Sequence, residues 1–197
     1  MFLKRLYQPL ERAITESHLE EPISKQKDNI SAIKSGRDVV YIDELEKGKS
    51  TAIAIAVINK LKEEFEDVPR AMIIVPDKEE GEKLEECFSI YGKYTSLRVH
   101  TAYETRLIED QRDEIYFGTD ILIGTVKQIN KLYAISGINI TGVKMFIIDN
   151  SDKVITDANQ SEVERICESL PKCQKILVGT KINSRVERII DQHMLIY

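Results

Sequence analysis

The chain has 197 residues, of which 42% are apolar and 31% are charged. A chain of this length buries about 70% of the surface that its unfolded form exposes, so neither disulfides nor structural metal ions are needed to stabilise it. The net charge of −5 excludes a protein that binds nucleic acid through an overall basic surface, so any contact with nucleic acid must be local.

The cysteines and the hydropathy profile indicate the compartment. Cys167 and Cys173 lie six positions apart, the chain has three cysteines in all, and no C-x-x-C pair occurs. This pattern predicts reduced thiols, because it matches neither a disulfide framework nor a usual metal site. The first residues lack the apolar core of a signal peptide, and no stretch approaches the length of a membrane span. We therefore expect a cytoplasmic protein without membrane contact.

Short apolar runs alternate with amphipathic helical segments along the chain. Two helical segments, about residues 7–16 and 24–34, precede the first strand. The expected strands are, in chain order, Asp38–Asp43, Ala71–Val75, Leu97–His100, Asp120–Gly124, Lys144–Asp149 and Lys175–Gly179. The helices expected to follow the first, second, fourth, fifth and sixth of these strands are Thr51–Phe65, Glu79–Tyr91, Val126–Ile135, Gln160–Leu170 and Ser184–Met194.

This alternation predicts the fold class. The strand-like runs are rich in Ile and Val and nearly continuous in hydrophobicity, as is typical of strands that are covered on both faces. We therefore expect an α/β fold with three layers and a mostly parallel central sheet. The whole chain, residues 1–197, is expected to form one domain, with a helical lead-in over residues 1–36 and the α/β core over residues 37–197.

Ligands of open α/β sheets bind at the carboxyl ends of the strands, and the first strand is followed there by a phosphate-loop pattern. Gly48-Lys49-Ser50 matches the last three positions of G-x-x-x-x-G-K-[ST], although Asp43 stands where the opening glycine belongs. Such a loop holds phosphates with backbone amides and the lysine, while its hydroxyl holds Mg²⁺. The alternative is an ordinary turn that opens a helix. The candidate nucleotide-binding residues of the loop are Glu46, Lys47, Gly48, Lys49, Ser50 and Thr51.

Three further segments complete a pattern with this loop: Leu6–Ile14, Glu21–Gln26 and Gly36–Val39. Together they resemble the Q motif and phosphate loop of DEAD-box RNA helicases, and the resemblance to the N-terminal RecA-like domain of that family covers essentially the whole chain. It implies a RecA-like (P-loop NTPase) fold, ATP and Mg²⁺ as cofactors, and RNA as a partner. It also implies that Gln26 reads adenine, for which an amide is suited, and that Phe2 or Tyr7 stacks on the base.

Two segments resemble the family's contacts to the RNA backbone. Val75–Glu79 is similar to the P-T-R-E-L-A segment, and Ile123–Gln128 is similar to the T-P-x-R segment. Each lacks the family's arginine and therefore the bidentate hydrogen bonding to phosphate that an arginine provides. The alternative is that the lysines of these segments are simply solvated. The residues that the resemblance assigns to RNA are Pro76, Lys78, Thr125 and Lys127.

The remaining motifs depart from the family at catalytic positions. Asp149 stands at the first position of D-E-A-D, which supports Mg²⁺, but Asn150 replaces the glutamate that polarises the attacking water. An amide cannot take a proton from water, and loss of a general base slows such chemistry by about 10²–10⁴-fold. Glu46 places a carboxylate where the family has glycine, which costs on the order of 1–4 kcal/mol beside a phosphate.

The segment that couples ATP to strand separation in the family, S-A-T, corresponds to the stretch around Gly179, Thr180 and Lys181. Both hydroxyl-bearing residues of that motif are changed in this chain, although Thr180 lies one position away from a motif position. We therefore expect the coupling of ATP state to strand separation to be impaired.

Three hypotheses follow. The first is a DEAD-box helicase-like domain that binds ATP and RNA, with hydrolysis weak or lost. The second is a non-catalytic relative that serves as an RNA- or protein-binding module. The third is an unrelated α/β protein with a chance Gly-Lys-Ser. By the resemblance, unwinding also requires a second RecA-like domain as partner.

Overall fold

The computed structural model describes residues 6–17, 30–43, 48–190 and 194–196. Their strands form one seven-stranded sheet in the order β3-β4-β2-β5-β6-β1-β7, and every described strand pair is parallel. The sheet is thus wholly parallel in the described residues, where we expected a mostly parallel one. The strands are β1 (Val39–Ile42), β2 (Ala71–Val75), β3 (Val99–Ala102), β4 (Ile121–Thr125), β5 (Met145–Asp149), β6 (Gln174–Gly179) and β7 (Leu195–Ile196).

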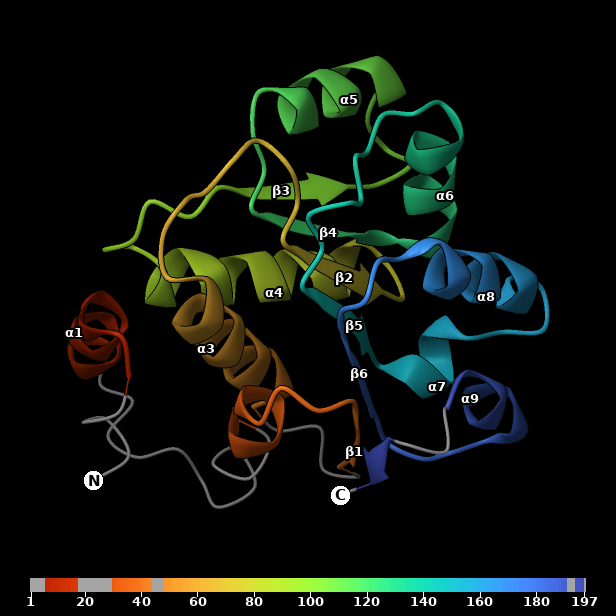
Figure 1. The fold of residues 1–197 in the computed structure, drawn as a ribbon, viewed down its shortest axis with the longest axis horizontal. Coiled ribbons are helices and arrows are strands. Elements are labelled where there is room, and N and C mark those ends of the chain that lie inside the picture. Colours follow the sequence, from red (N-terminus) through yellow and green to blue (C-terminus); the bar gives the residue numbers. More distant parts are fainter. Residues whose placement is uncertain (1–5, 18–29, 44–47, 191–193, 197) are drawn as a thin grey trace.

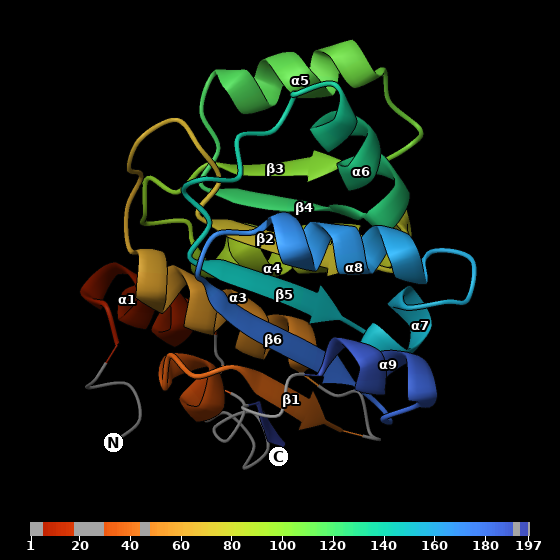
Figure 2. The ribbon, with the colours of Figure 1, turned by 45° about the vertical axis from the view of Figure 1, so that its right-hand side comes forward.

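Helices cover both faces of the sheet and create three layers (Figures 1 and 2). One face carries α1 (Gln8–Glu16), α3 (Lys49–Leu61) and α4 (Lys78–Tyr91), together with the helical residues 30–34. The other face carries α5 (Ile108–Tyr116), α6 (Val126–Ala134), α7 (Ser151–Val154), α8 (Gln160–Ser169) and α9 (Ser184–Ile189). The expected α/β architecture with three layers is therefore confirmed.

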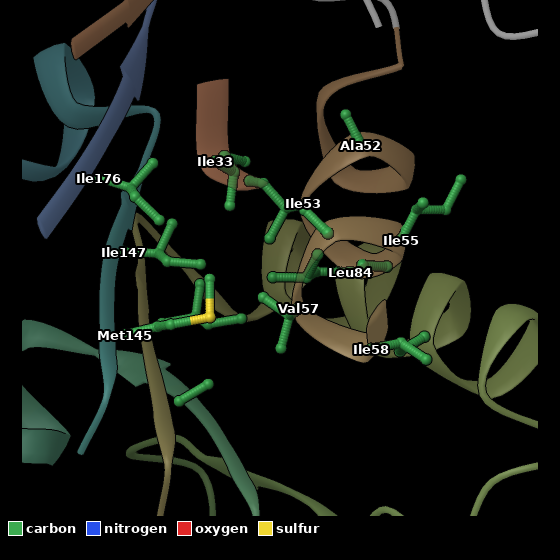
Figure 3. Packing of buried hydrophobic residues seen from close by; sticks show 14 of the residues in the cluster. Ile33, Ala52, Ile53, Ile55, Val57, Ile58, Leu84, Met145, Ile147 and Ile176 are labelled. Carbon is green, nitrogen blue, oxygen red and sulfur yellow. The ribbon is translucent and has the colours of Figure 1, made fainter. Parts of the chain in front are cut away.

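The strands are apolar throughout because successive side chains enter two different cores. In β5, Met145 and Ile147 join the core beneath α3, whereas Phe146 and Ile148 join the core beneath α6 and α8. A strand alternates its side chains between faces, so burial on both sides requires a continuous apolar run. Figure 3 shows Ile53 of α3 pointing toward the buried side chains of the sheet.

Several element boundaries differ from those expected. Helix α3 ends at Leu61 instead of Phe65, because Lys62 adopts a positive φ of 67° that a helix cannot continue. The third strand lies at Val99–Ala102 instead of Leu97–His100. The last helix stops at Ile189, short of the expected Met194, and β7 follows it. Of the expected helix over residues 24–34, residues 30–34 are helical and the rest lie outside the described residues.

Helix α5 was not expected from the sequence. Between Ile108 and Ile115 it contains only polar residues, so it lacks an apolar stripe. Gln111 is buried in its place, and its amide donates to the carbonyls of Tyr103, Arg106 and Leu107. The helix is therefore held against the preceding loop by hydrogen bonds from the Gln111 side chain to backbone carbonyls of that loop. None of the helices in the described part of the chain is long and apolar enough to cross a bilayer.

Candidate functional site

The carboxyl ends of the parallel strands meet at one edge of the sheet, which we call the carboxyl edge. Asp43, just after β1, donates its backbone N–H to the carbonyl of Gly179 at the end of β6, at 2.9 Å. In the strand order, β6 lies between β1 and β5, so the segment after Asp149 follows next along this edge. The topology therefore gathers three of the segments that carry the predicted motifs.

The phosphate-loop segment opens α3. Gly48 is its N-cap with φ 78° and ψ 13°, a left-handed conformation that glycine adopts without strain. Lys49 is the first helical residue and is only 6% exposed. Ser50 is partly buried, and the hydroxyl of Thr51 lies 4.0 Å from the thiol of Cys87 on α4. Glu46 and Lys47 lie outside the described residues.

Lys49 meets Asn150 across the carboxyl edge. The Lys49 ammonium donates a hydrogen bond to the side-chain oxygen of Asn150, a residue that is 2% exposed. Asn150 has φ 54° and ψ 49°, a left-handed conformation that asparagine tolerates better than most residues. Its backbone N–H donates to the buried carboxylate of Asp149 at 2.9 Å. The structure thus brings together Lys49, Asp149 and Asn150 at the carboxyl edge.

Glu80 belongs to this cluster, and sequence reasoning missed it. Its carboxylate accepts a hydrogen bond from the Asn150 amide nitrogen at 3.4 Å. The first turn of α4 is held in place by its N-cap, since the Asp77 carboxylate accepts from the Glu80 N–H at 2.9 Å. One signal was available, because Glu80 directly follows Glu79 in the segment that resembles P-T-R-E-L-A.

The segment that resembles S-A-T contacts α7 through Thr180. Thr180 donates its hydroxyl to the Asp152 carboxylate at 2.8 Å and its backbone N–H to the same group at 2.9 Å. Burial alone would raise the pKa of Asp152, but these two hydrogen bonds from Thr180 lower it below the usual 3.8. Gly179 is required beside them, since a Cβ there would lie 2.7 Å from an Asp152 oxygen. Lys181 is exposed.

The residues assigned to RNA lie at the ends of β2 and β4. Pro76 is partly buried, and Lys78 is exposed and pairs with Glu82 at 3.3 Å. Thr125 caps α6 by accepting from the Gln128 N–H at 3.3 Å, and Lys127 is exposed.

A carboxylate stands beside this surface. The Thr125 hydroxyl donates a hydrogen bond to the Glu104 carboxylate at 2.9 Å, so in this arrangement the hydroxyl does not donate to a phosphate. Sequence reasoning did not anticipate this contact, because Glu104 lies in the loop after β3, 21 positions from Thr125.

The structure does not bring Tyr7 to the phosphate loop. Its hydroxyl donates to Glu63, and its backbone N–H donates to Asn59 at 2.9 Å, near the far end of α3. Asn59 and Lys49 are ten residues apart on the helix, which is about 15 Å. Gln26 and Phe2, the other residues expected at the base, lie outside the described residues.

Comparison with known proteins identifies the family. A family model described as DEAD/DEAH box helicase matches residues 23–188. The chain belongs to the DEAD/DEAH box helicase family. ATP-dependent RNA helicase DeaD of Mycobacterium tuberculosis is 28% identical over 166 residues, which cover 84% of this chain and 29% of that protein. Eukaryotic initiation factor 4A of Caenorhabditis elegans is 20% identical, with 96% of this chain and 47% of that protein covered.

Solved structures agree on the fold. A DEAD box protein from the hyperthermophile Methanococcus jannaschii has a TM-score of 0.87 at 21% identity, covering 97% of this chain and 54% of that one. Dbp5 of S. cerevisiae, bound to Nup159, Gle1, IP6 and ADP, has a TM-score of 0.84 at 16% identity, covering 98% and 52%. The chain is thus an N-terminal RecA-like domain in fold, and it spans less than half the length of the two curated relatives above.

Proposed function

We propose that this chain is an ATP- and RNA-binding RecA-like domain of a DEAD-box helicase in which ATP hydrolysis is weak or lost. The observation that carries the proposal is the buried contact between Lys49 and Asn150 at the carboxyl edge. It supports a phosphate site, because the ammonium sits at a helix N-terminus, where backbone amides and the helix dipole also favour an anion. The same contact puts an amide where the family has its general base.

The residues present suit MgATP. Asp149, at the end of β5, supplies a buried carboxylate, and Ser50, in the first turn of α3, supplies a hydroxyl. Oxygen ligands of this kind are those that Mg²⁺ prefers. When bound, the ion neutralises charge on the phosphates. Lys49 would leave Asn150 to hold the phosphates, and Gln26 would select adenine. Glu46 is expected to weaken this binding.

The weak step is removal of a proton from water. The Asn150 side chain can orient a water through its oxygen or its amide protons, but it cannot accept the proton that the attacking water must lose. Hydrolysis should therefore be about 10²–10⁴-fold slower than with a positioned general base. The hydrogen bonds from Thr180, just after β6, to Asp152 of α7 connect these two segments. They support some remaining coupling between ATP state and strand separation.

A second candidate is a non-catalytic module that binds RNA or a protein. The protein-binding form of this candidate is favoured by Glu104, because its carboxylate accepts a hydrogen bond from the Thr125 hydroxyl on the surface assigned to RNA. For either candidate, the whole chain is proposed to act as one cytoplasmic domain, with residues 1–36 as its lead-in. Strand separation would need a second RecA-like domain or another protein, because this chain spans only part of its relatives.

Phosphate release from MgATP tests the proposal, measured with and without single-stranded RNA. We expect bound ATP, weaker binding of GTP, and turnover that RNA raises little. A Gln26→Ala variant should lose the preference for ATP over GTP. RNA-stimulated turnover at the rate of an intact DEAD-box helicase would overturn the claim that Asn150 disables the site. Retained RNA or protein binding without any nucleotide binding would favour the second candidate.

A further inference from the structure

Glu80 places a carboxylate beside the altered position of the D-E-A-D segment. One of its oxygens accepts from Lys83 at 2.8 Å, and the other accepts from the Asn150 amide nitrogen at 3.4 Å. The Glu80 side chain is 32% exposed, whereas Asn150 is 2% exposed. The carboxylate therefore reaches from the rim of the carboxyl edge to a buried amide.

The contacts on either side of Asn150 determine how its amide is turned. Its oxygen accepts from the Lys49 ammonium, and its nitrogen donates to Glu80. A carboxylate has no proton to donate, and an ammonium has no lone pair to offer, so each end of the amide has one suitable partner. Glu80 thus directs the Asn150 oxygen toward Lys49, where the phosphates are proposed to bind.

The same geometry disfavours a negatively charged side chain at position 150. A glutamate at position 150 would bring a second carboxylate to within hydrogen-bonding distance of Glu80. Two carboxylates at this distance repel each other, so the charged pair is destabilised. Lys49, which donates to the side chain at position 150, would offset part of this repulsion. Because the Asn150 side chain is neutral, Glu80 supplies the one carboxylate of this side-chain pair.

We propose that Glu80 is a positioning residue for Asn150 and that positions 80 and 150 form a coupled pair that holds a single carboxylate. In this chain the acid sits on α4 at position 80, while the D-E-A-D pattern puts it at position 150. Consequently, a glutamate at position 150 restores hydrolysis only when Glu80 is neutralised at the same time. The hydrolysis part of this inference rests on the proposed function, but the coupling itself does not.

A nucleotide-free double-mutant cycle tests the coupling. Urea unfolding is measured for the wild type, Asn150→Glu, Glu80→Gln and the double variant at pH 7. The Asn150→Glu substitution should lower the folding equilibrium constant about tenfold more when Glu80 is present than when it is replaced by Gln. The strain of a glutamate at a left-handed position is common to both backgrounds, so the cycle cancels it. Independent, multiplying effects of the two substitutions would overturn the proposal.

Two controls keep this outcome clear. Glu79→Gln removes an equal charge from the same helix, and Glu79 shares the partner Lys83 at 3.0 Å while being 80% exposed. It should show no coupling to position 150. If Asn150→Glu does not fold, Asn150→Asp replaces it in the cycle, because aspartate tolerates the left-handed conformation better. A coupling as large for Glu79→Gln as for Glu80→Gln would also overturn the proposal.

Phosphate release from MgATP then tests the consequence for hydrolysis. The double variant should release phosphate at least about tenfold faster than either single variant. Asn150→Glu alone reaching the rate of the double variant would overturn the inference. If no protein in the set binds MgATP, the proposed function fails, whereas the unfolding cycle still decides whether positions 80 and 150 are coupled.

Discussion

Thr180 and Asp152 join the end of β6 to α7 through two hydrogen bonds to one carboxylate. The hydroxyl and the backbone N–H of Thr180 lie 2.8 and 2.9 Å from the two Asp152 oxygens. Both residues are partly buried, and Gly179 leaves no room for a side chain between them. This contact joins the segment that resembles S-A-T to the segment that resembles D-E-A-D.

Removal of the Thr180 hydroxyl should destabilise the fold. We expect Thr180→Val to lower the free energy of unfolding by about 1.5–3 kcal/mol, as is usual for a hydrogen bond to a charged group. Urea unfolding at pH 7 measures it, with Thr156→Val as a control because Thr156 is exposed. Equal stability of the two variants would show that the Asp152 contact contributes nothing.

The buried ion pair at the opposite edge of the sheet should make stability depend on pH. Asp120 is fully buried and accepts from Arg70 at 2.6 Å and from Arg98 at 2.9 Å. Burial alone would raise the pKa of Asp120, but hydrogen bonds from Arg98, Arg70 and the Phe65 amide lower it below 3.8. A lowered pKa gives stability that is present above the unfolded value, near 4, and is lost as pH falls through the folded value.

We therefore expect Asp120→Asn to destabilise the chain at pH 7 by about 3–5 kcal/mol, since it leaves Arg70 buried without its counter-charge. The difference from the wild type should shrink as the pH is lowered below about 4. Asp113→Asn is the control, because Asp113 is 59% exposed. A difference in unfolding free energy that stays constant from pH 7 to pH 3 would contradict this account.

Glu104 should oppose RNA binding. Its carboxylate holds the Thr125 hydroxyl at 2.9 Å, and a phosphate near that hydroxyl would be repelled by about 1 kcal/mol or more. Glu104→Gln should therefore tighten binding of single-stranded RNA roughly fivefold at low salt, with a smaller gain at high salt. Fluorescence anisotropy measures the affinity.

Glu168→Gln provides the control for this effect, since it removes the same charge from the exposed last turn of α8, which precedes the amino end of β6. An equal gain in RNA affinity for both variants would assign the effect to net charge and not to the Thr125 contact.

The Tyr103 hydroxyl is buried with no hydrogen-bond partner among the described residues. Burying such a group costs about 1–3 kcal/mol, and burial raises the pKa of Tyr103 far above its usual range. Tyr103→Phe should therefore raise the free energy of unfolding by about 1 kcal/mol. Thermal unfolding monitored by circular dichroism measures this, and a lower melting temperature would refute it.

The sequence predicted β1, β2, β4, β5 and β6 to within one residue because burial on both faces demands continuous apolar runs, as in β2 and β5. It misplaced β3 by two residues and missed β7. It failed where a polar residue packs for reasons that local pattern does not show, as Gln111 does in α5. In the site, Lys49 and Asp149 could be predicted because Lys49 lies in the segment after β1 and Asp149 is the last residue of β5. Glu80 lies in a segment that the resemblance marked, but its contact with Asn150 could not be predicted, since it spans 70 positions and depends on where α4 lies relative to the segment after β5.

Calorimetric titration of MgATP into the wild type and into Lys49→Ala tests the central claim most directly. The claim is that the buried Lys49 ammonium belongs to a nucleotide site at the carboxyl edge. It predicts binding at about micromolar dissociation constants in the wild type, at least tenfold weaker binding in Lys49→Ala, and unchanged binding in Lys60→Ala, an exposed lysine of the same helix. Equal affinity of Lys49→Ala and the wild type, or heat in neither, would contradict it.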